Sequence, residues 1–142
     1  MKEFSTHWKS SKKPKKQRKY QAKAPMHIKR KFLSTTLSKE LRAKYKIRNI
    51  IVRKGDTVKV MKGKFDGKTG KVSEVKTNLM KIYVEGIQKK KQDGSMVNIP
   101  FRAPNLQITD LNTDDKKRFK KLKTESQKKN EAKNEKGEEK KK

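Results

Sequence analysis

Glycine is concentrated in one stretch of the sequence, RKGDTVKVMKGKFDGKTGKV, which runs from Arg53 to Val72. Glycine adopts positive φ values and lets two backbones approach closely, and a sharp turn between two strands requires both. The run therefore predicts two short strands joined by a tight loop. Four of the 7 glycines in the 142-residue chain lie in this run: Gly55, Gly63, Gly67 and Gly70.

Apolar residues alternate with polar ones in five segments between residues 55 and 112, which is typical of strands with one buried face. Turn-forming residues separate the segments, so we predict a mainly β fold, a small and strongly bent antiparallel barrel over residues 51–112. The alternating residues are Val58 and Val60; Val72; Met80, Ile82 and Val84; Val97 and Ile99; and Leu106 and Ile108.

Two irregularities are expected within this barrel. Val72 and Val75 lie on opposite sides of a regular strand, so a bulge is predicted near Ser73-Glu74. The segment GIQKKKQDGSMV predicts a projecting hairpin with its tip near Asp93-Gly94, a dipeptide suited to a tight turn. Gly55-Asp56 is expected to be a plain turn before the first strand.

The excess of positive charge indicates what kind of partner the chain binds. The chain has 43 Lys+Arg against 15 Asp+Glu, a formal net charge of +28, and only 29% hydrophobic residues. Residues 1–54 carry 19 basic and 2 acidic side chains, whereas residues 113–142 carry 13 and 7. Such an excess favours a polyanionic partner, and nucleic acid is the commonest in a cell. A merely solvated lysine-rich chain is the alternative.

Residues 1–50 are predicted to form a basic extension with two short helices, one from Pro25 through MHIKRKFL and one over LSKELRAKY, with Thr36 or Ser38 as its N-cap. The preceding segment, KSSKKPKKQRKYQAKAP, is too rich in lysine and proline for regular structure. Trp8, Tyr20 or His27 is expected to stack on unpaired bases. Packing against the barrel is the alternative for Trp8.

Residues 113–142 read as a lysine-rich tail, disordered or marginally helical, because Phe119 and Leu122 are its only sizeable apolar residues. Since its acids partly cancel its bases, we expect deletion of residues 113–142 to be tolerated. Deletion of residues 1–36, in contrast, is expected to abolish incorporation into the assembly that the chain serves.

Several functions are made improbable by what the sequence lacks. It has no cysteine, and two isolated histidines make a poor metal site, so we expect no metal or other cofactor. No triad or metal cluster indicates an enzyme, and no small-molecule substrate is expected. GKFDGKTG does not follow the order of a nucleotide-binding loop. With no long apolar run and no signal-peptide core, we expect a cytoplasmic protein without membrane insertion.

Lysines Lys62, Lys64, Lys68 and Lys71 occupy the same loop as the glycines. The turn explains the glycines but not the bias of the loop toward positive charge. Glycine loops with free backbone N–H groups and flanking lysines are suited to phosphate oxygens, so we predict that this loop contacts a nucleic-acid backbone.

The stretch KGDTVKVMKGKFDGKTGKVSEV resembles the KOW motif. With the arm HWKSSKKPKKQRKYQAKAPMHIKRKFLS and the helix LSKELRAKY, the chain resembles, over about residues 1–111, the archaeal and eukaryotic form of the universal large-subunit ribosomal protein number twenty-four, number twenty-six in eukaryotes. IPFRAPNL departs from the family, which usually has a His-Pro-Ser-Asn-like turn where Arg102-Ala103-Pro104-Asn105 stands here.

The resemblance implies an SH3-like barrel that binds large-subunit ribosomal RNA near its 5′ region, beside neighbouring ribosomal proteins. It also implies action early in subunit assembly and a place near the exit of the peptide tunnel. A transcription elongation factor with a KOW module, or a DNA-compacting protein, would show similar charge. The residues expected to contact RNA are His7, Trp8, Lys9, Lys12, Lys13, Lys15, Lys16, Arg18, Lys19, Tyr20, His27, Arg30, Lys31, Arg53, Lys54, Lys62, Lys64, Lys68, Lys71, Lys89, Lys90 and Lys91.

Overall fold

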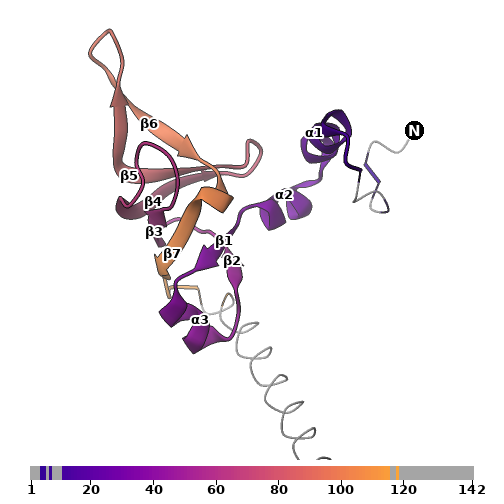
Figure 1. Cartoon of the computed structure of the whole chain (residues 1–142), viewed down its shortest axis with the longest axis horizontal. Helices are drawn as coiled ribbons and strands as arrows, with labels where there is room; N and C mark the ends of the chain where they lie inside the picture. Colours follow the sequence, from indigo (N-terminus) through magenta and orange to yellow (C-terminus); the bar gives the residue numbers. More distant parts are fainter. Residues whose placement is uncertain (1–3, 6, 8–10, 116–117, 119–142) are drawn as a thin grey trace, which may run out of the picture.

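The computed structural model describes residues 4, 5, 7, 11–115 and 118. A seven-stranded, strongly bent sheet with strand order β2-β1-β7-β3-β4-β5-β6 makes up its centre (Figure 1). Its elements are α1 (Pro14–Lys23), α2 (Met26–Phe32), β1 (Ser34–Leu37), α3 (Lys39–Tyr45), β2 (Asn49–Ile51), β3 (Thr57–Val60), β4 (Thr69–Lys76), β5 (Lys81–Lys90), β6 (Met96–Phe101), the 3₁₀ turn η1 (Ala103–Asn105) and β7 (Leu106–Asp110).

The five predicted strands are present as β3 to β7, and two irregularities bend them into a barrel-like shape. The expected bulge is confirmed, because the pairing of β4 with β5 shifts register between Val72 and Glu74. A second shift separates Tyr83 from Gln88 in the pairing of β5 with β6, beside Gly86, whose φ is +75°. Local twist increases at such bulges, so β5 curls over β4.

The core lies inside this curled sheet. Val58 and Val60 of β3 pair with Ile108 and Leu106 of β7, and none of the four side chains is more than 1% exposed. The alternation read from the sequence therefore corresponds to a real inner face. Other members of this core are Leu33, Leu37, Val52, Val72, Ile82, Val84, Ile87, Phe101, Ala103 and Leu111.

Two strands were not predicted, β1 and β2, and they flank α3. β1 runs parallel to β7 and antiparallel to β2, so the sheet draws strands from both sides of the boundary expected at residue 50. Leu37, predicted to start the helix, instead ends β1 with a fully buried side chain. The helix begins later because the Ser38 hydroxyl accepts a hydrogen bond from the Leu41 N–H, which confirms one of the two proposed N-caps.

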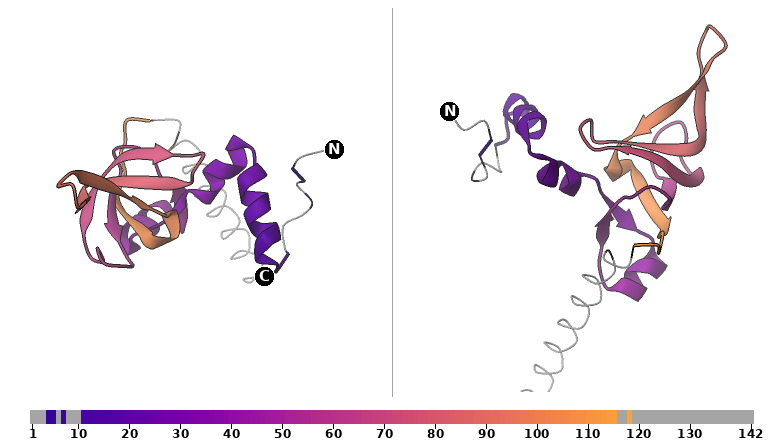
Figure 2. Two further views of the ribbon diagram at one scale, coloured as in Figure 1. Left: turned by 90° about the horizontal axis from the view of Figure 1, so that it is seen from above. Right: turned by 180° about the vertical axis from the view of Figure 1, so that it is seen from behind.

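The arm is more regular than predicted. The expectation of no regular structure before Pro25 is wrong, because α1 occupies Pro14–Lys23. Proline is harmless in the first turn, where its missing N–H has no intrahelical partner, and Lys, Gln, Arg and Ala are good helix formers. The helix from Pro25 is confirmed as α2, with Pro25 as its N-cap. Both helices lie beside the sheet, with α1 farther out (Figures 1 and 2).

Aromatic rings join these two helices. The ring of Tyr20 in α1 lies 4.8 Å from the ring of Phe4 and 6.3 Å from that of Phe32 in α2, measured between centroids. Offset and edge-to-face pairs of this kind each add about 0.5–1.5 kcal/mol beyond area burial. None of the residues of α1 is buried, so α1 packs against its neighbours through the ring of Tyr20.

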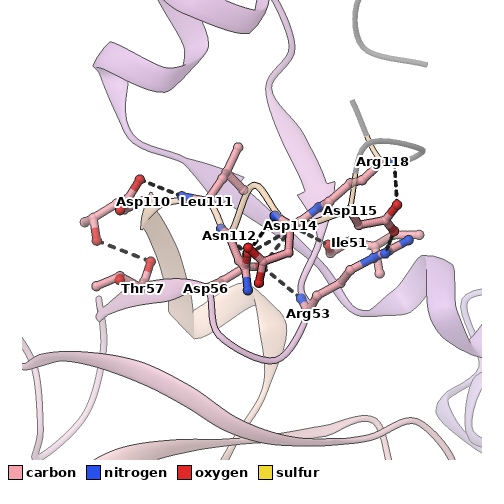
Figure 3. Close-up of polar contacts among 11 residues, drawn as sticks. Ile51, Arg53, Asp56, Thr57, Asp110, Leu111, Asn112, Asp114, Asp115 and Arg118 are labelled. Atoms are coloured by element: carbon pink, nitrogen blue, oxygen red, sulfur yellow. Dashed lines mark hydrogen bonds and ion pairs between the residues drawn. The ribbon is translucent and has the colours of Figure 1, made fainter. Parts of the chain in front are cut away.

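A buried ion pair joins the segment after β7 to the start of the barrel (Figure 3). The guanidinium of Arg118 donates from Nη1 and Nη2 to the two carboxylate oxygens of Asp56, over 2.7 and 2.8 Å, and both side chains are almost fully buried. Backbone N–H groups of Arg53 and Asn112 donate to the same carboxylate. The expectation that Gly55-Asp56 forms a plain turn is therefore incomplete, because the Asp56 carboxylate also forms a buried ion pair.

This pair changes which tail deletion should be tolerated. Arg118→Ala leaves the Asp56 carboxylate buried without its counter-charge, so unfolding should become easier by about 3–5 kcal/mol. A chain that ends after Arg118 keeps the pair and should melt like the full chain, whereas one that ends at residue 112 should not. Thermal or urea unfolding followed by circular dichroism measures the difference.

The matched control is Arg53→Ala. Arg53 forms an ion pair with Asp115 in which both side chains are at least a third exposed, so its loss should cost less than about 1 kcal/mol. Equal destabilisation by Arg53→Ala and Arg118→Ala would contradict the role given to the buried pair.

The motif glycines serve two different purposes. Gly63 and Gly67 have φ values of +99° and +81°, and a Cβ atom on either would meet nothing within 4 Å. Gly70 has no positive φ, but a Cβ there would lie 2.7 Å from the backbone oxygen of Glu85 and 2.8 Å from Cγ1 of Val84. The loop needs glycine for its backbone angles, whereas β4 needs it because β5 crosses closely.

We therefore expect alanine substitutions to differ. Gly63→Ala and Gly67→Ala should each destabilise the fold by about 1–2 kcal/mol through backbone strain alone. Gly70→Ala should destabilise it more, because a backbone oxygen cannot move aside cheaply. Thermal melts of the three variants give the ranking, and a Gly70→Ala protein as stable as the natural chain would disprove the close-approach argument.

Candidate nucleic-acid interface

The loop between β3 and β4 presents its lysines to solvent. Lys62, Lys64 and Lys68 are all exposed, and Lys71 follows as an exposed residue of β4. The Nζ of Lys68 lies 5.5 Å from the ring centroid of Phe65, whose ring in turn meets Phe101 edge-on. One lysine of the loop is thereby held near the barrel surface.

The backbone of this loop differs from the expectation of free N–H groups. Within the loop, the Gly67 N–H donates to the Val60 oxygen over 2.9 Å, the Asp66 N–H to Gly63, and the Lys68 N–H to Phe65. These amides already have partners because the positive φ values fold the loop back on itself. The exposed lysine side chains are the cationic groups of this loop that can contact phosphate.

The predicted hairpin is present as β5 and β6 and projects from the sheet (Figure 1). Lys89, Lys90 and Lys91 are exposed along its stem. At the tip, Gly94 has a φ of +84°. The hydroxyl and the N–H of Ser95 both donate to Oδ1 of Asp93, which lowers the pKa of that carboxyl, the hydroxyl contributing most. The tip is thus closed by its own side chains.

The arm helices carry the third group of charges. Of the residues predicted there, His7, His27 and all the described lysines and arginines are exposed. Tyr20 is not available for stacking on a base because it packs between Phe4 and Phe32. Trp8 and Lys9 lie outside the described residues. The exposed cations are Lys12, Lys13, Lys15, Lys16, Arg18, Lys19, Arg30 and Lys31.

Arg53 and Lys54, the last of the predicted contacts, precede β3. Both are exposed, but the Arg53 guanidinium is paired with the Asp115 carboxylate, so only Lys54 presents an uncompensated charge. A sequence-based search missed this pairing because the partners are 62 residues apart.

The three groups of cations lie on separate parts of the molecule. The hairpin and the arm helices project from the sheet in different directions in both views of Figure 2. The three groups of cations therefore face different directions and do not form one common site. Such a distribution suits a partner that surrounds the protein on several sides.

In the part of the chain that the structure describes, no group of three or more His, Cys, Asp or Glu residues could hold a metal ion. No helix there is both long and apolar enough to cross a membrane. The described residues therefore offer a partner positive charge, hydrogen-bonding side chains and exposed apolar residues.

Comparison with known proteins relates the chain to one family. Residues 11–125 match the family described as the ribosomal proteins L26 of eukaryotes and L24 of archaea. The chain is also 48% identical over 112 residues to the large ribosomal subunit protein uL24 of Methanospirillum hungatei, an alignment that covers 79% of this chain and 93% of that protein.

Both matches confirm the resemblance carried by the KOW motif, the arm and the third helix. They also confirm the expectations of a ribosomal protein that is not an enzyme and that works in the cytoplasm as part of the ribosome. The chain belongs to the family of large-subunit ribosomal proteins that comprises eukaryotic L26 and archaeal L24.

Proposed function

We propose that this protein binds large-subunit ribosomal RNA near its 5′ region, joins the subunit early in assembly and lies near the exit of the peptide tunnel, beside other large-subunit proteins. The observation that carries RNA binding is the exposure of lysines on three separate elements: the β3–β4 loop, the β5–β6 hairpin and α1. The location and the timing rest on the family resemblance.

Phosphate neutralisation supplies the binding free energy. Lysine side chains displace condensed counterions from RNA, which favours binding by an amount that falls with salt concentration. The contacts on the hairpin and the loop come from a fold that is already ordered. Folded ribosomal RNA offers phosphates on several sides of a protein, and the three groups of cations match this arrangement.

The alternatives fit the structure less well. A KOW-type transcription factor is expected to carry a separate folded domain before the barrel, whereas β1 and β2 join the same sheet as the barrel strands. A DNA-compacting protein would share the charge. Competition between duplex DNA and protein-free large-subunit RNA separates these functions, and preference for duplex DNA would count against the proposal.

Binding to RNA should depend steeply on salt. If about 8 phosphates are neutralised, the slope of log affinity against log salt should be about −6 to −7, a loss of about 10⁴-fold between 50 and 200 mM. Replacing Lys89, Lys90 and Lys91 by alanine should make the slope shallower by about 2–3. Filter binding over a salt series measures it, and a slope shallower than about −3 would refute the electrostatic account.

Incorporation should depend on the arm. Deleting residues 1–36 would also remove most of β1, so a fairer test replaces Lys15, Lys16, Arg18 and Lys19 of α1 by alanine, which keeps helix propensity. We expect this variant to be lost from large ribosomal particles during a high-salt wash, measured by co-sedimentation, because four phosphate-binding cations are gone.

The control removes the same number of charges from around α3: alanine replaces Lys39, Lys44 and Arg48, and glycine replaces Lys46, whose φ is +57°. All four residues are exposed, and none is a predicted contact. In Figure 1, α3 lies well apart from α1. Equal loss of both variants would show that only total charge matters and would contradict the assignment of the arm as an RNA anchor.

A further inference from the structure

A small crevice lies where the arm helices, the β4–β5 turn and η1 meet, on the same side of the molecule in Figures 1 and 2. Its volume is about 210 Å³, less than the roughly 300–1,000 Å³ of most small-molecule sites. A space of this size can hold one ring system of a ligand. Its walls include the apolar residues Phe32, Leu79, Met80 and Pro104 and the polar residues Gln21 and Arg102.

The apolar walls are exposed and fixed in place. Leu79 is 62% exposed and Phe32 is 36% exposed, although each is large and apolar. The contact with Tyr20 orients the ring of Phe32. Met80 has a φ of +53°, a value uncommon for a residue other than glycine, and its N–H donates to the Thr77 oxygen. Strained residues of this kind tend to persist at binding sites.

The polar lining indicates the chemistry of the occupant. Arg102 is the charged residue of this lining and is cationic, while the Gln21 amide both donates and accepts hydrogen bonds. Gln21 belongs to α1, the helix that carries Lys15, Lys16, Arg18 and Lys19. A group with an apolar face, a polar edge and an attached anion would satisfy all of these features.

We infer that this crevice receives one unpaired nucleobase of the RNA that the chain binds. The base would lie against Phe32 and Leu79, its polar edge would face Gln21, and Arg102 would meet the phosphate or the base. The inference rests on the proposed RNA binding and adds a contact that reads a base rather than a phosphate.

An apolar side chain from a neighbouring protein is the other candidate occupant. It would use the same walls but would make no hydrogen bond with the exposed Gln21 and Arg102 side chains. An unpaired base satisfies them, and stacking on aromatic side chains is the usual means by which proteins hold such bases. The lining therefore favours the base.

Nuclear magnetic resonance on the full chain tests the inference directly. Hexaadenylate should shift the methyl resonances of Leu79 and Met80 upfield, because the ring current of a stacked base acts on them. A hexamer of abasic sugar phosphates should perturb only the lysine-rich loop, hairpin and helices. Equal shifts of these methyl groups by both oligomers would overturn the inference.

Substitutions give a second, independent readout. Phe32→Leu and Leu79→Ser should each weaken hexaadenylate binding, by about 5- to 150-fold for the aromatic residue, with the salt slope unchanged since no charge is lost. Ile51→Ser, at a residue of β2 that is 37% exposed and lies outside the proposed RNA-binding elements, is the matched control and should bind normally. Equal weakening by Ile51→Ser would overturn the inference.

The remaining outcomes separate the crevice from the proposed function. If hexaadenylate perturbs the lysine-rich elements but not the crevice, the inference fails while RNA binding stands. If neither oligomer perturbs any part of the protein, both fail. Protection of Leu79 only when other large-subunit proteins are added would show a protein occupant and would likewise overturn the inference.

Discussion

The buried carboxylate of Asp56 joins parts of the chain that are far apart in sequence. Its two oxygens accept hydrogen bonds from the Arg53 N–H, the Asn112 N–H and both terminal nitrogens of Arg118, and its own backbone oxygen accepts from the Val72 N–H. The connection before β3, the middle of β4 and the segment after β7 are thereby fixed to one residue. A sheet this small has few other long-range polar contacts with so many partners.

The same arrangement shows how the molecule tolerates a net charge of +28. One arginine is withdrawn into the interior and neutralised, and a second pairs with Asp115 at the surface. Three groups of the remaining cations lie on elements that project from the sheet, namely α1, the β3–β4 loop and the β5–β6 hairpin. Separation between these elements weakens their mutual repulsion, since exposed charges more than about 10 Å apart are largely screened at 0.1 M salt.

Sequence analysis predicted those features that depend on neighbouring residues. Alternation located β3 to β7, and the opposite parity of Val72 and Val75 located the bulge, since both patterns are local. It missed β1, whose Thr35 is buried by contact with Ala103 and whose pairing partner is β7, about 70 residues away. It missed α1 because the lysine-rich composition of this segment is also typical of irregular structure, although Pro14 suits the first turn of a helix.

Sequence analysis likewise predicted only part of the candidate site. The exposed lysines of the loop and hairpin follow from sequence, because lysine seldom lies buried. That Tyr20 packs against other rings, and that Arg118 binds Asp56, could not follow from spacing, as both depend on how distant segments meet. One local signal existed, since Arg118 is the single arginine among the lysines of residues 113–142 and Arg is preferred for bidentate pairing with a carboxylate.

The hydrogen bonds within the β3–β4 loop have a consequence for the entropy of association. Ordering a free backbone costs about 1–2 kcal/mol per residue, and a loop that became ordered only on contact with RNA would add that cost to binding. Gly63 and Gly67 let the loop close on itself during folding. In the proposed complex with RNA, its lysines would therefore bind from a preorganised backbone, and only their side-chain rotamers would remain to be ordered.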